Sequence, residues 1–308
     1  PHGGIRVIQR IDSSRPLEAS RWGWRCFQIG LFFLPSSALL ASLLLFPSLL
    51  MGSWRSERPF WRDPWNAPLF VASLLMVIGC FASYSGSLAW VGMGNWLPFF
   101  WAFWGFQPYV SSVEASHRSA LWLVAGSFPV VLTGLGQLWW GWQGPWQVLG
   151  GSIIWFMTPG GEPEGRLSGL FDYAKIAAAW LALVWPLALA ALIQPGLNKL
   201  RRGVVLGLVV AFVTALVLTE SRNGWGSLVL VLPIVLGPIS WPWLVPLLSV
   251  GLGVLIVSVV PGVPLLIQAP ARSLVPAGLW GRRSDSQHAG ERVLASTRLS
   301  QWGGAQQL

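Results

Sequence analysis

The chain has 308 residues, of which 54% are hydrophobic and only 10% are charged, and its formal net charge is +9. Soluble domains carry about 25% charged residues, so this composition indicates a membrane protein and excludes an ordinary soluble enzyme. The positive charge is nearly all arginine, placed in connections beside apolar runs. That pattern is typical of membrane topology and anionic lipid, so membrane lipids are expected partners and nucleic acid is not.

Apolar runs of roughly 17–25 residues mark helical membrane spans. The sequence therefore predicts an all-α fold, a polytopic bundle of about eight transmembrane helices. The third span is short and aromatic, which is typical of a re-entrant segment, and Gly237-Pro238 divides the last long run in two. The expected spans are 28–51, 68–92, 95–110, 119–139, 173–194, 203–219, 225–238 and 241–260.

These spans define three regions. Residues 1–27 form a polar N-terminal segment without the features of a signal peptide, 28–260 form the transmembrane domain, and 261–308 begin an extracytoplasmic loop. Many of the 22 Trp residues flank the apolar runs, as expected of aromatic belts at the membrane interfaces. Cys26 and Cys80 both lie in apolar runs and are expected to be free buried thiols.

The topology follows from the basic residues. Lys199, Arg201 and Arg202 crowd the connection 195–203, which is therefore predicted to be cytoplasmic. Counting spans from that connection places 140–172, 220–224 and the tail after Pro261 outside. The N-terminal arginines lie outside if 28–51 crosses once, and inside if that run forms a hairpin around Pro35. The inside placement is preferred because connections rich in Lys and Arg are usually cytoplasmic.

Two arginines remain on the outer side, Arg166 and Arg222. The spans 173–194 and 203–219 are joined by a short connection, so they are expected to pack antiparallel with neighbouring outer ends. Two guanidinium groups there would suit a diphosphate, because each offers a planar fork of donors and keeps its charge. The alternative is that both side chains reach lipid headgroups, or that Glu220 pairs with Arg222.

The stretch Thr219-Glu220-Ser221-Arg222-Asn223-Gly224-Trp225, with Arg166 upstream and Arg298-Leu299-Ser300-Gln301-Trp302 downstream, resembles the O-antigen ligase and polymerase superfamily. The resemblance covers about residues 95–308. It implies a bacterial inner-membrane glycosyltransferase without a metal or other cofactor. Such enzymes move a glycan from an undecaprenyl diphosphate carrier to a lipid or sugar acceptor.

The resemblance also implies roles for individual residues. Arg166 and Arg222 would bind the diphosphate, with Lys175 and Arg298 as further candidates. The residues that support the motif around Arg222 are Ser221, Asn223, Gly224 and Trp225.

Three features depart from the family pattern. Tyr173-Ala174-Lys175 stands where relatives have asparagine-proline-asparagine, and Asn223 stands where many have glycine. The histidine implied to be catalytic lies beyond Leu308, and His2, His117 and His288 do not replace it. The catalytic residue is therefore unassigned, and the chain is expected to be an inactive fragment of a longer enzyme.

Two other classes of function stay open. One branch of the superfamily, from photosynthetic bacteria, carries a bicarbonate-transporter label, and the tryptophan content and the Tyr-Ala-Lys replacement resemble that branch. Charges clustered at the outer rim favour the transferase, because transporters usually hold polar groups at mid-depth. The third class is a non-catalytic membrane scaffold.

Overall fold

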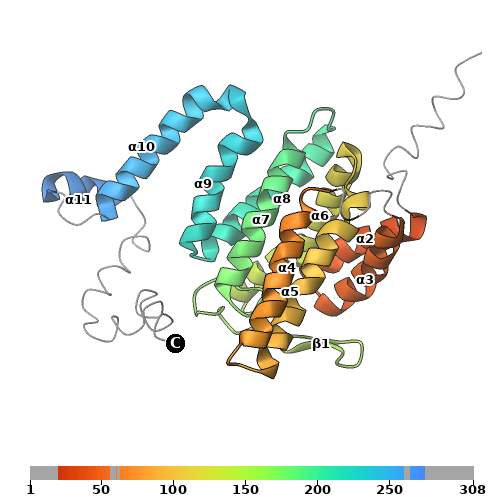
Figure 1. The fold of residues 1–308 in the computed structure, drawn as a ribbon. Coiled ribbons are helices and arrows are strands. Elements are labelled where there is room, and N and C mark those ends of the chain that lie inside the picture. The colour runs from red at the N-terminus through yellow and green to blue at the C-terminus, as the bar shows by residue number, and fades with distance from the viewer. Residues whose placement is uncertain (1–19, 56–59, 61–62, 260–263, 275–308) are drawn as a thin grey trace, which may run out of the picture. The chain divides into compact units, whose positions relative to one another are not determined.

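The computed structural model describes residues 20–55, 60, 63–259 and 264–274, and these are mostly helical (Figure 1). The chain divides between Thr219 and Glu220 into two compact units. The first unit holds seven α-helices among its described residues: α2 (Arg21–Phe33), α3 (Ala38–Arg55), α4 (Asn66–Ala82), α5 (Ser87–Gly105), α6 (Val113–Trp139), α7 (Ala174–Leu192) and α8 (Lys199–Leu218). A short 3-10 helix, η2 (Gln107–Tyr109), joins α5 to α6.

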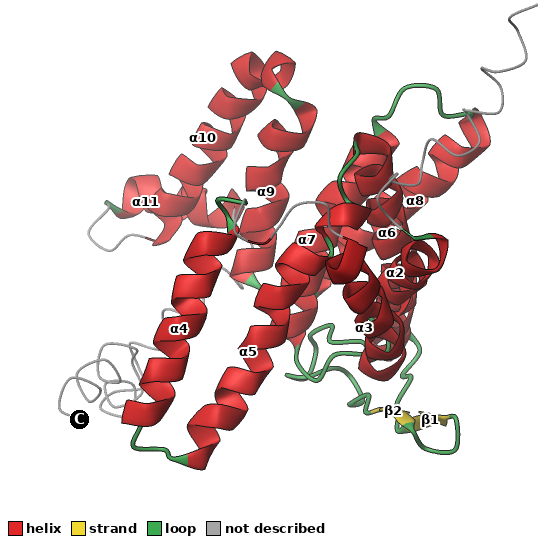
Figure 2. Ribbon diagram, turned by 45° about the vertical axis from the view of Figure 1, so that its right-hand side comes forward, coloured by secondary structure: helices red, strands yellow, loops and turns green. Residues whose placement is uncertain are grey.

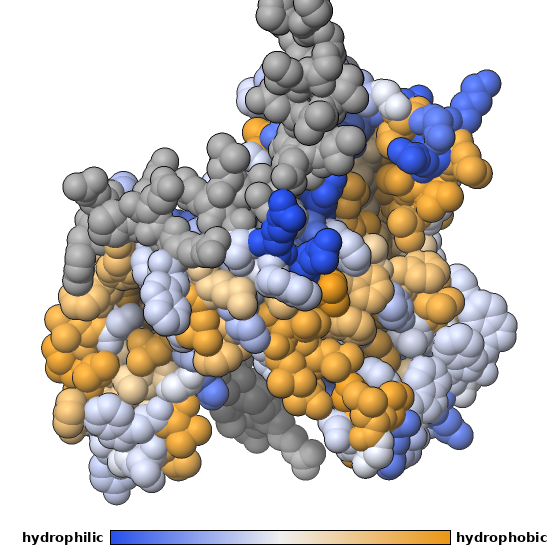
Figure 3. Space-filling view, turned by 90° about the vertical axis from the view of Figure 1, so that its right-hand side faces the viewer, coloured by the Kyte–Doolittle hydropathy of each residue, from blue (hydrophilic) through white to orange (hydrophobic). Residues whose placement is uncertain are grey.

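Four helical segments of the described chain are long and apolar enough to cross a membrane: Val113–Trp139, Ala174–Leu192, Lys199–Leu218 and Pro238–Ser258. They indicate a multi-pass membrane protein. Apolar side chains cover much of the face shown in Figure 3, and the strongly hydrophilic ones gather in a few places. An apolar exterior of this kind suits a lipid environment, where the bilayer covers the surface that a soluble protein would bury.

The early helices differ from the predicted bounds in two places. The run 28–51 is divided at Pro35, as the preferred hairpin alternative predicts, but α2 already starts at Arg21 and ends at Phe33, and α3 starts at Ala38. The expected break between the second and third runs, near 93, lies instead at Ser83–Gly86, so the third predicted run falls largely on the 19-residue helix α5. Gly86 has a φ of 55° at the start of α5, a left-handed conformation that glycine adopts without a Cβ penalty.

The all-α prediction also needs a correction. The connection between α6 and α7 contains a two-stranded antiparallel sheet, formed by β1 (Trp146–Val148) and β2 (Ile153–Trp155). Trp146 pairs with Trp155 and Val148 with Ile153, so these side chains share one face of the ribbon. The strands were not anticipated because their residues are as apolar as those of the spans.

Helices α2 and α3 pack as an antiparallel hairpin, and α2 packs against α6. Their shared core contains Trp24, Phe27 and Tyr109, whose rings stack on one another. The Tyr109 hydroxyl donates to the Ser48 carbonyl at 2.7 Å, so the one polar atom of this buried ring is satisfied. At the crossing of α2 and α6, a Cβ on Gly126 would collide with the Phe32 carbonyl, and the missing side chain lets the two backbones meet.

The two ends of the first unit differ in charge. The turns 34–37 and 83–86 and the β-hairpin carry no charged residue, and the Trp155 indole donates to the Ser36 carbonyl. Figures 1 and 2 show the β-hairpin and the α4–α5 turn at the same end of this unit. The opposite end holds the basic starts of α2 and α8, with Arg21, Arg25 and Lys199. The α2–α3 hairpin therefore returns the chain to the basic end at Arg55, as the hairpin alternative predicts.

The second unit contains α9 (Arg222–Leu236), the 3-10 helix η3 (Pro238–Ser240), α10 (Trp241–Val259) and α11 (Leu265–Leu274). The predicted break at Gly237-Pro238 is confirmed, because α9 ends at Leu236 and Gly237 has a φ of 76°. The Trp241 indole donates to the Pro233 carbonyl at 2.8 Å across this corner. Residues 275–308, including Arg298, lie outside the described chain.

Candidate functional site

The candidate site is the loop of residues 156–173, here called the arginine loop, which joins the β-hairpin to α7. Its fold depends on Gln137, which lies in the last turn of α6 and is only 1% exposed. The Gln137 Nε2 donates to the Thr158 carbonyl at 2.7 Å, and its Oε1 accepts from the Gly169 N–H at 2.8 Å. The same amide contacts the Ser168 hydroxyl. A single side chain thus holds the two limbs of the loop together.

Further contacts fix the loop against the helices. The fully buried Leu167 side chain packs against Gly134 of α6, and the Leu167 N–H donates to the Leu218 carbonyl at 2.9 Å. The Ala174 N–H, at the start of α7, donates to the Glu162 carbonyl at 2.8 Å. The arginine loop is therefore bonded to α6, α7 and α8. These contacts hold its side chains in fixed positions, as in a regular element of the fold.

Arg166 lies at the centre of this loop and is 6% exposed. Its Nε donates to the Thr219 carbonyl at 2.8 Å, where α8 ends. The last carbonyls of a helix carry a partial negative charge, so the bond caps α8 and stabilises the guanidinium. The Arg166 side chain is therefore built into the fold.

The capping bond uses only one edge of the Arg166 guanidinium. Within the described residues no carboxylate pairs with Arg166, and the Nη1 and Nη2 nitrogens have no protein acceptor. A neutral carbonyl and a partial helix charge offset only part of a full positive charge. A largely buried arginine with two unused nitrogens is suited to bind an anion, because an oxyanion would supply both the charge and the acceptors.

The other predicted residue of the first unit has a different environment. Lys175 is exposed in the first turn of α7, and its Nζ lies 5.8 Å from the centre of the Tyr173 ring. An exposed lysine beside an aromatic face is a weak cation–π contact. Nothing in this geometry brings Lys175 to Arg166, so its part in an anion site stays a prediction.

The motif around Arg222 forms the start of α9. Ser221 is the N-cap residue, and its hydroxyl accepts from the buried Gly224 N–H at 3.5 Å. Arg222 and Asn223 are exposed at the first two helical positions, and Trp225 is half-buried. The alternative that Glu220 pairs with Arg222 stays a prediction. The serine of the motif thus has a structural role in capping, and the Arg222 side chain is exposed in the first turn of the helix.

Gln137 and Ser168 belong to the site without having been predicted. The signal for Gln137 is that it is the single amide in the otherwise apolar run 119–139. Its bonds join segments 21 and 31 residues away, and sequence gives no direct indication of such pairings.

Comparison of the chain with models of known protein families, with curated proteins and with solved structures gives no match. The helices and the arginine loop therefore have to be interpreted from their own geometry.

Proposed function

We propose that this chain is a membrane glycosyltransferase, resembling O-antigen ligases and polymerases, that takes a glycan from an undecaprenyl diphosphate carrier and passes it to a lipid or sugar acceptor. The observation that carries the proposal is the Arg166 guanidinium, which is buried, held by a helix end and not neutralised by a described carboxylate. A polyprenyl diphosphate is an anion that reaches a protein from within the bilayer.

The placement of the site supports a lipid-linked substrate. The arginine loop joins the β-hairpin to α7, a helix long enough to cross a membrane, so it would lie where the hydrocarbon ends. In the proposed topology the basic ends of α2 and α8 are cytoplasmic, and the arginine loop is on the outer side of a bacterial inner membrane. The carrier diphosphate would then lie at the depth of the Arg166 side chain, with its prenyl chain among the apolar helices. About eight spans remain our proposal for the bundle.

The chemical role follows from charge. When the glycosidic bond breaks, negative charge develops on the leaving diphosphate, and a fixed guanidinium stabilises that charge without rearrangement. Arg166 would bind the diphosphate in this way, and Arg222 would do the same from the start of α9, where free N–H groups also favour anions. Lys175 and Arg298 stay secondary candidates. No metal or cofactor takes part in this proposal.

The decisive measurement is binding, because it does not require the acceptor. The full chain in lipid nanodiscs is titrated with farnesyl diphosphate, a short prenyl diphosphate. Arg166→Lys loses the planar fork, and the loss of one charge-assisted hydrogen bond of about 1.5–3 kcal/mol weakens binding about tenfold or more. Arg202→Lys, an exposed position at the opposite end of α8, is the matched control and leaves affinity unchanged. Equal affinity of the Arg166→Lys and wild-type chains would contradict the proposal.

A second variant keeps the test independent of folding. Arg222 is exposed in the first turn of α9, so Arg222→Lys should not disturb the helix that it begins. We expect this change to abolish glycan transfer by the full-length protein while its expression stays normal. Transfer at the wild-type rate would remove Arg222 from the site.

The transport alternative makes opposite predictions. A bicarbonate site would bind bicarbonate in competition with farnesyl diphosphate, and the variant chains would lose bicarbonate uptake while glycan display stayed normal. Outer arginines could serve either anion, so the two functions are separated by measuring bicarbonate uptake and glycan display in the same variant.

A further inference from the structure

We propose that the β-hairpin between α6 and α7, with the tryptophans that flank it, is a membrane-interface anchor that lies in the lipid headgroup layer. The surface concerned, here called the hairpin surface, consists of Trp139, Trp140, Leu149, Ile154 and Phe156. This inference does not depend on the transferase proposal, because it rests on apolar exposure and charge alone.

The first observation is the absence of charge. From Ser119 to Gly161 the sequence contains no Asp, Glu, Lys, Arg or His, although only the part up to Trp139 is helix. A connection that projects into water normally carries charged side chains, and the rest of this connection, from Glu162 on, does so. The charge-free composition of the α6 span therefore continues without interruption through the hairpin.

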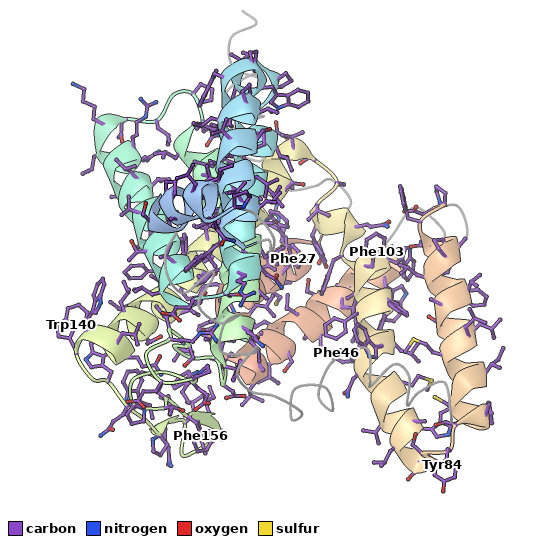
Figure 4. All side chains as sticks on the ribbon, turned by 90° about the vertical axis from the view of Figure 1, so that its left-hand side faces the viewer. Phe27, Phe46, Tyr84, Phe103, Trp140 and Phe156 are labelled. Atoms are coloured by element: carbon purple, nitrogen blue, oxygen red, sulfur yellow. The ribbon has the colours of Figure 1, made fainter. Side chains whose placement is uncertain are left out.

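The second observation is what the hairpin exposes. Leu149 at the turn is 61% exposed, and Phe156 after β2 is 65% exposed. Figure 4 shows Phe156 and Trp140 at the periphery of the first unit, on the same connection. The opposite face of the ribbon is used internally, because Ile153 is buried and Trp155 donates to the Ser36 carbonyl. The hairpin is thus held to the bundle through Ile153 and Trp155. Its other face carries Ile154 and the exposed Gln147, while Leu149 and Phe156 are exposed at its turn and its end.

The third observation is the arrangement of the tryptophans. Trp139, Trp140, Trp142 and Trp146 form a continuous series, with successive ring centres 6.0, 6.1 and 5.9 Å apart. Trp142 also packs against Gly136 of α6, which fixes the series to the helix end. Indole rings prefer the boundary between hydrocarbon and headgroups, where the ring is apolar and the N–H reaches a polar partner.

The backbone limits how deep the hairpin lies. A two-stranded ribbon has unpaired N–H and C=O groups along both outer edges, and these cannot be left without partners in hydrocarbon. The headgroup layer supplies water and lipid oxygens for the edges while it covers the apolar side chains. The position is therefore the interface, continuous with the lipid-facing surface of α6.

A sugar is a weaker candidate for this surface. Glycan stacking requires free ring faces, whereas each of the four indoles contacts at least one other indole ring. The ring planes are also inclined to one another by 77°, 31° and 55°, so they do not form a flat series. Glycan binding is accordingly an outcome of the test and not the proposal.

The test measures depth with spin labels. Leu149→Cys and Phe156→Cys are made in the full chain with Cys26→Ser and Cys80→Ser, labelled, and placed in vesicles of phosphatidylethanolamine and phosphatidylglycerol. Collisions with oxygen, which concentrates in lipid, are compared with collisions with a polar nickel chelate. Glu164→Cys, exposed on the same connection, is the matched control in water.

We expect the ratio of oxygen to nickel collisions at 149 and 156 to exceed that at 164 several-fold. Equal ratios at the three positions would overturn the proposal. Labels shielded from both reagents would also overturn it, in favour of a second protein copy. A glycan site would be indicated instead if a soluble oligosaccharide shielded the labels from both reagents in detergent while the collision ratios in vesicles showed no contact with lipid. That result would also overturn the proposal. Trp139→Ala with Trp140→Ala should lower the ratio at 149, because the anchoring rings are lost.

Discussion

At the scale of single residues, Arg166 shows how one side chain can cap a helix and still keep binding capacity. Its Nε caps α8 through the Thr219 carbonyl, and its two terminal nitrogens have no described protein acceptor. The presence of an outer arginine could be predicted from span counting. Its burial could not, because burial depends on the fold of a loop whose contacts are 21 to 53 residues apart in the sequence.

Gln137 is expected to control the stability of the arginine loop. In Gln137→Leu the Thr158 carbonyl and the Gly169 N–H lose their partners, and each unsatisfied buried group costs about 1–3 kcal/mol. Thermal unfolding in detergent should show a lower midpoint, and limited proteolysis should cut the loop earlier. Gln143→Leu, an exposed amide in the same connection, is the control and should behave as wild type. If the two variants were equally stable, Gln137 would not hold the loop.

Glu220 is expected to carry backbone strain. It has a φ of 48° directly after the C-cap of α8, a conformation that costs a residue with a Cβ about 1 kcal/mol or more. Glu220→Gly should therefore be more stable than Glu220→Ala by about 1 kcal/mol, less the extra unfolded-state entropy of glycine. Comparing these two variants removes the effect of losing the Glu220 side chain itself. A Glu220→Ala chain as stable as Glu220→Gly would show that the position is not strained.

At the scale of elements, the later helices agree with prediction and the earlier ones do not. Helices α7, α9 and α10 lie close to the predicted runs, because proline and glycine or a basic connection end each run. The break between α4 and α5 was misplaced because Ser83–Gly86 interrupts the apolar pattern with only a few small residues. The hairpin was missed although Gly150-Gly151 is a turn signal, since its strands share the composition of the spans.

The crossing of α2 and α6 should tolerate no side chain at Gly126. In Gly126→Ala the new methyl group meets the Phe32 backbone, which cannot move away without separating the helices, so we expect a loss of about 1–3 kcal/mol. Gly207→Ala in α8 is the matched control. A Cβ there meets nothing within 4 Å, and alanine favours helix by about 1 kcal/mol over glycine. The midpoint of thermal unfolding should fall in Gly126→Ala and not in Gly207→Ala. Midpoints that moved in the same direction in both variants would contradict this prediction.

At the scale of the whole molecule, the composition predicts a membrane protein, and the distribution of basic residues predicts which connections lie on the same side of the membrane. The helix hairpin α2–α3 removes the conflict over the N-terminal arginines, because it places Arg21, Arg25 and the end of α3 on one side of the first unit. The function is less accessible to sequence, since a short motif around Arg222 resembles a family while no family model matches the chain.

The topology can be checked in intact bacterial cells that express the chain. Gln194→Cys lies in the connection before α8 and Glu164→Cys in the arginine loop, and both positions are exposed. A thiol reagent that cannot cross membranes should label position 164 directly and position 194 only after the cells are made permeable, in a background without Cys26 and Cys80. Labelling of 194 in intact cells would reverse the proposed orientation.

The bonds between the arginine loop and α8 have a mechanical consequence. Two hydrogen bonds, from the Leu167 N–H to Leu218 and from the Arg166 Nε to Thr219, join the loop to the last turn of a 20-residue helix. Such a helix is a rigid rod about 30 Å long. A tilt or axial shift imposed at its basic end, by lipid charge or by another protein, would be transmitted along the rod and would move the Arg166 guanidinium by a similar distance on the other side of the membrane.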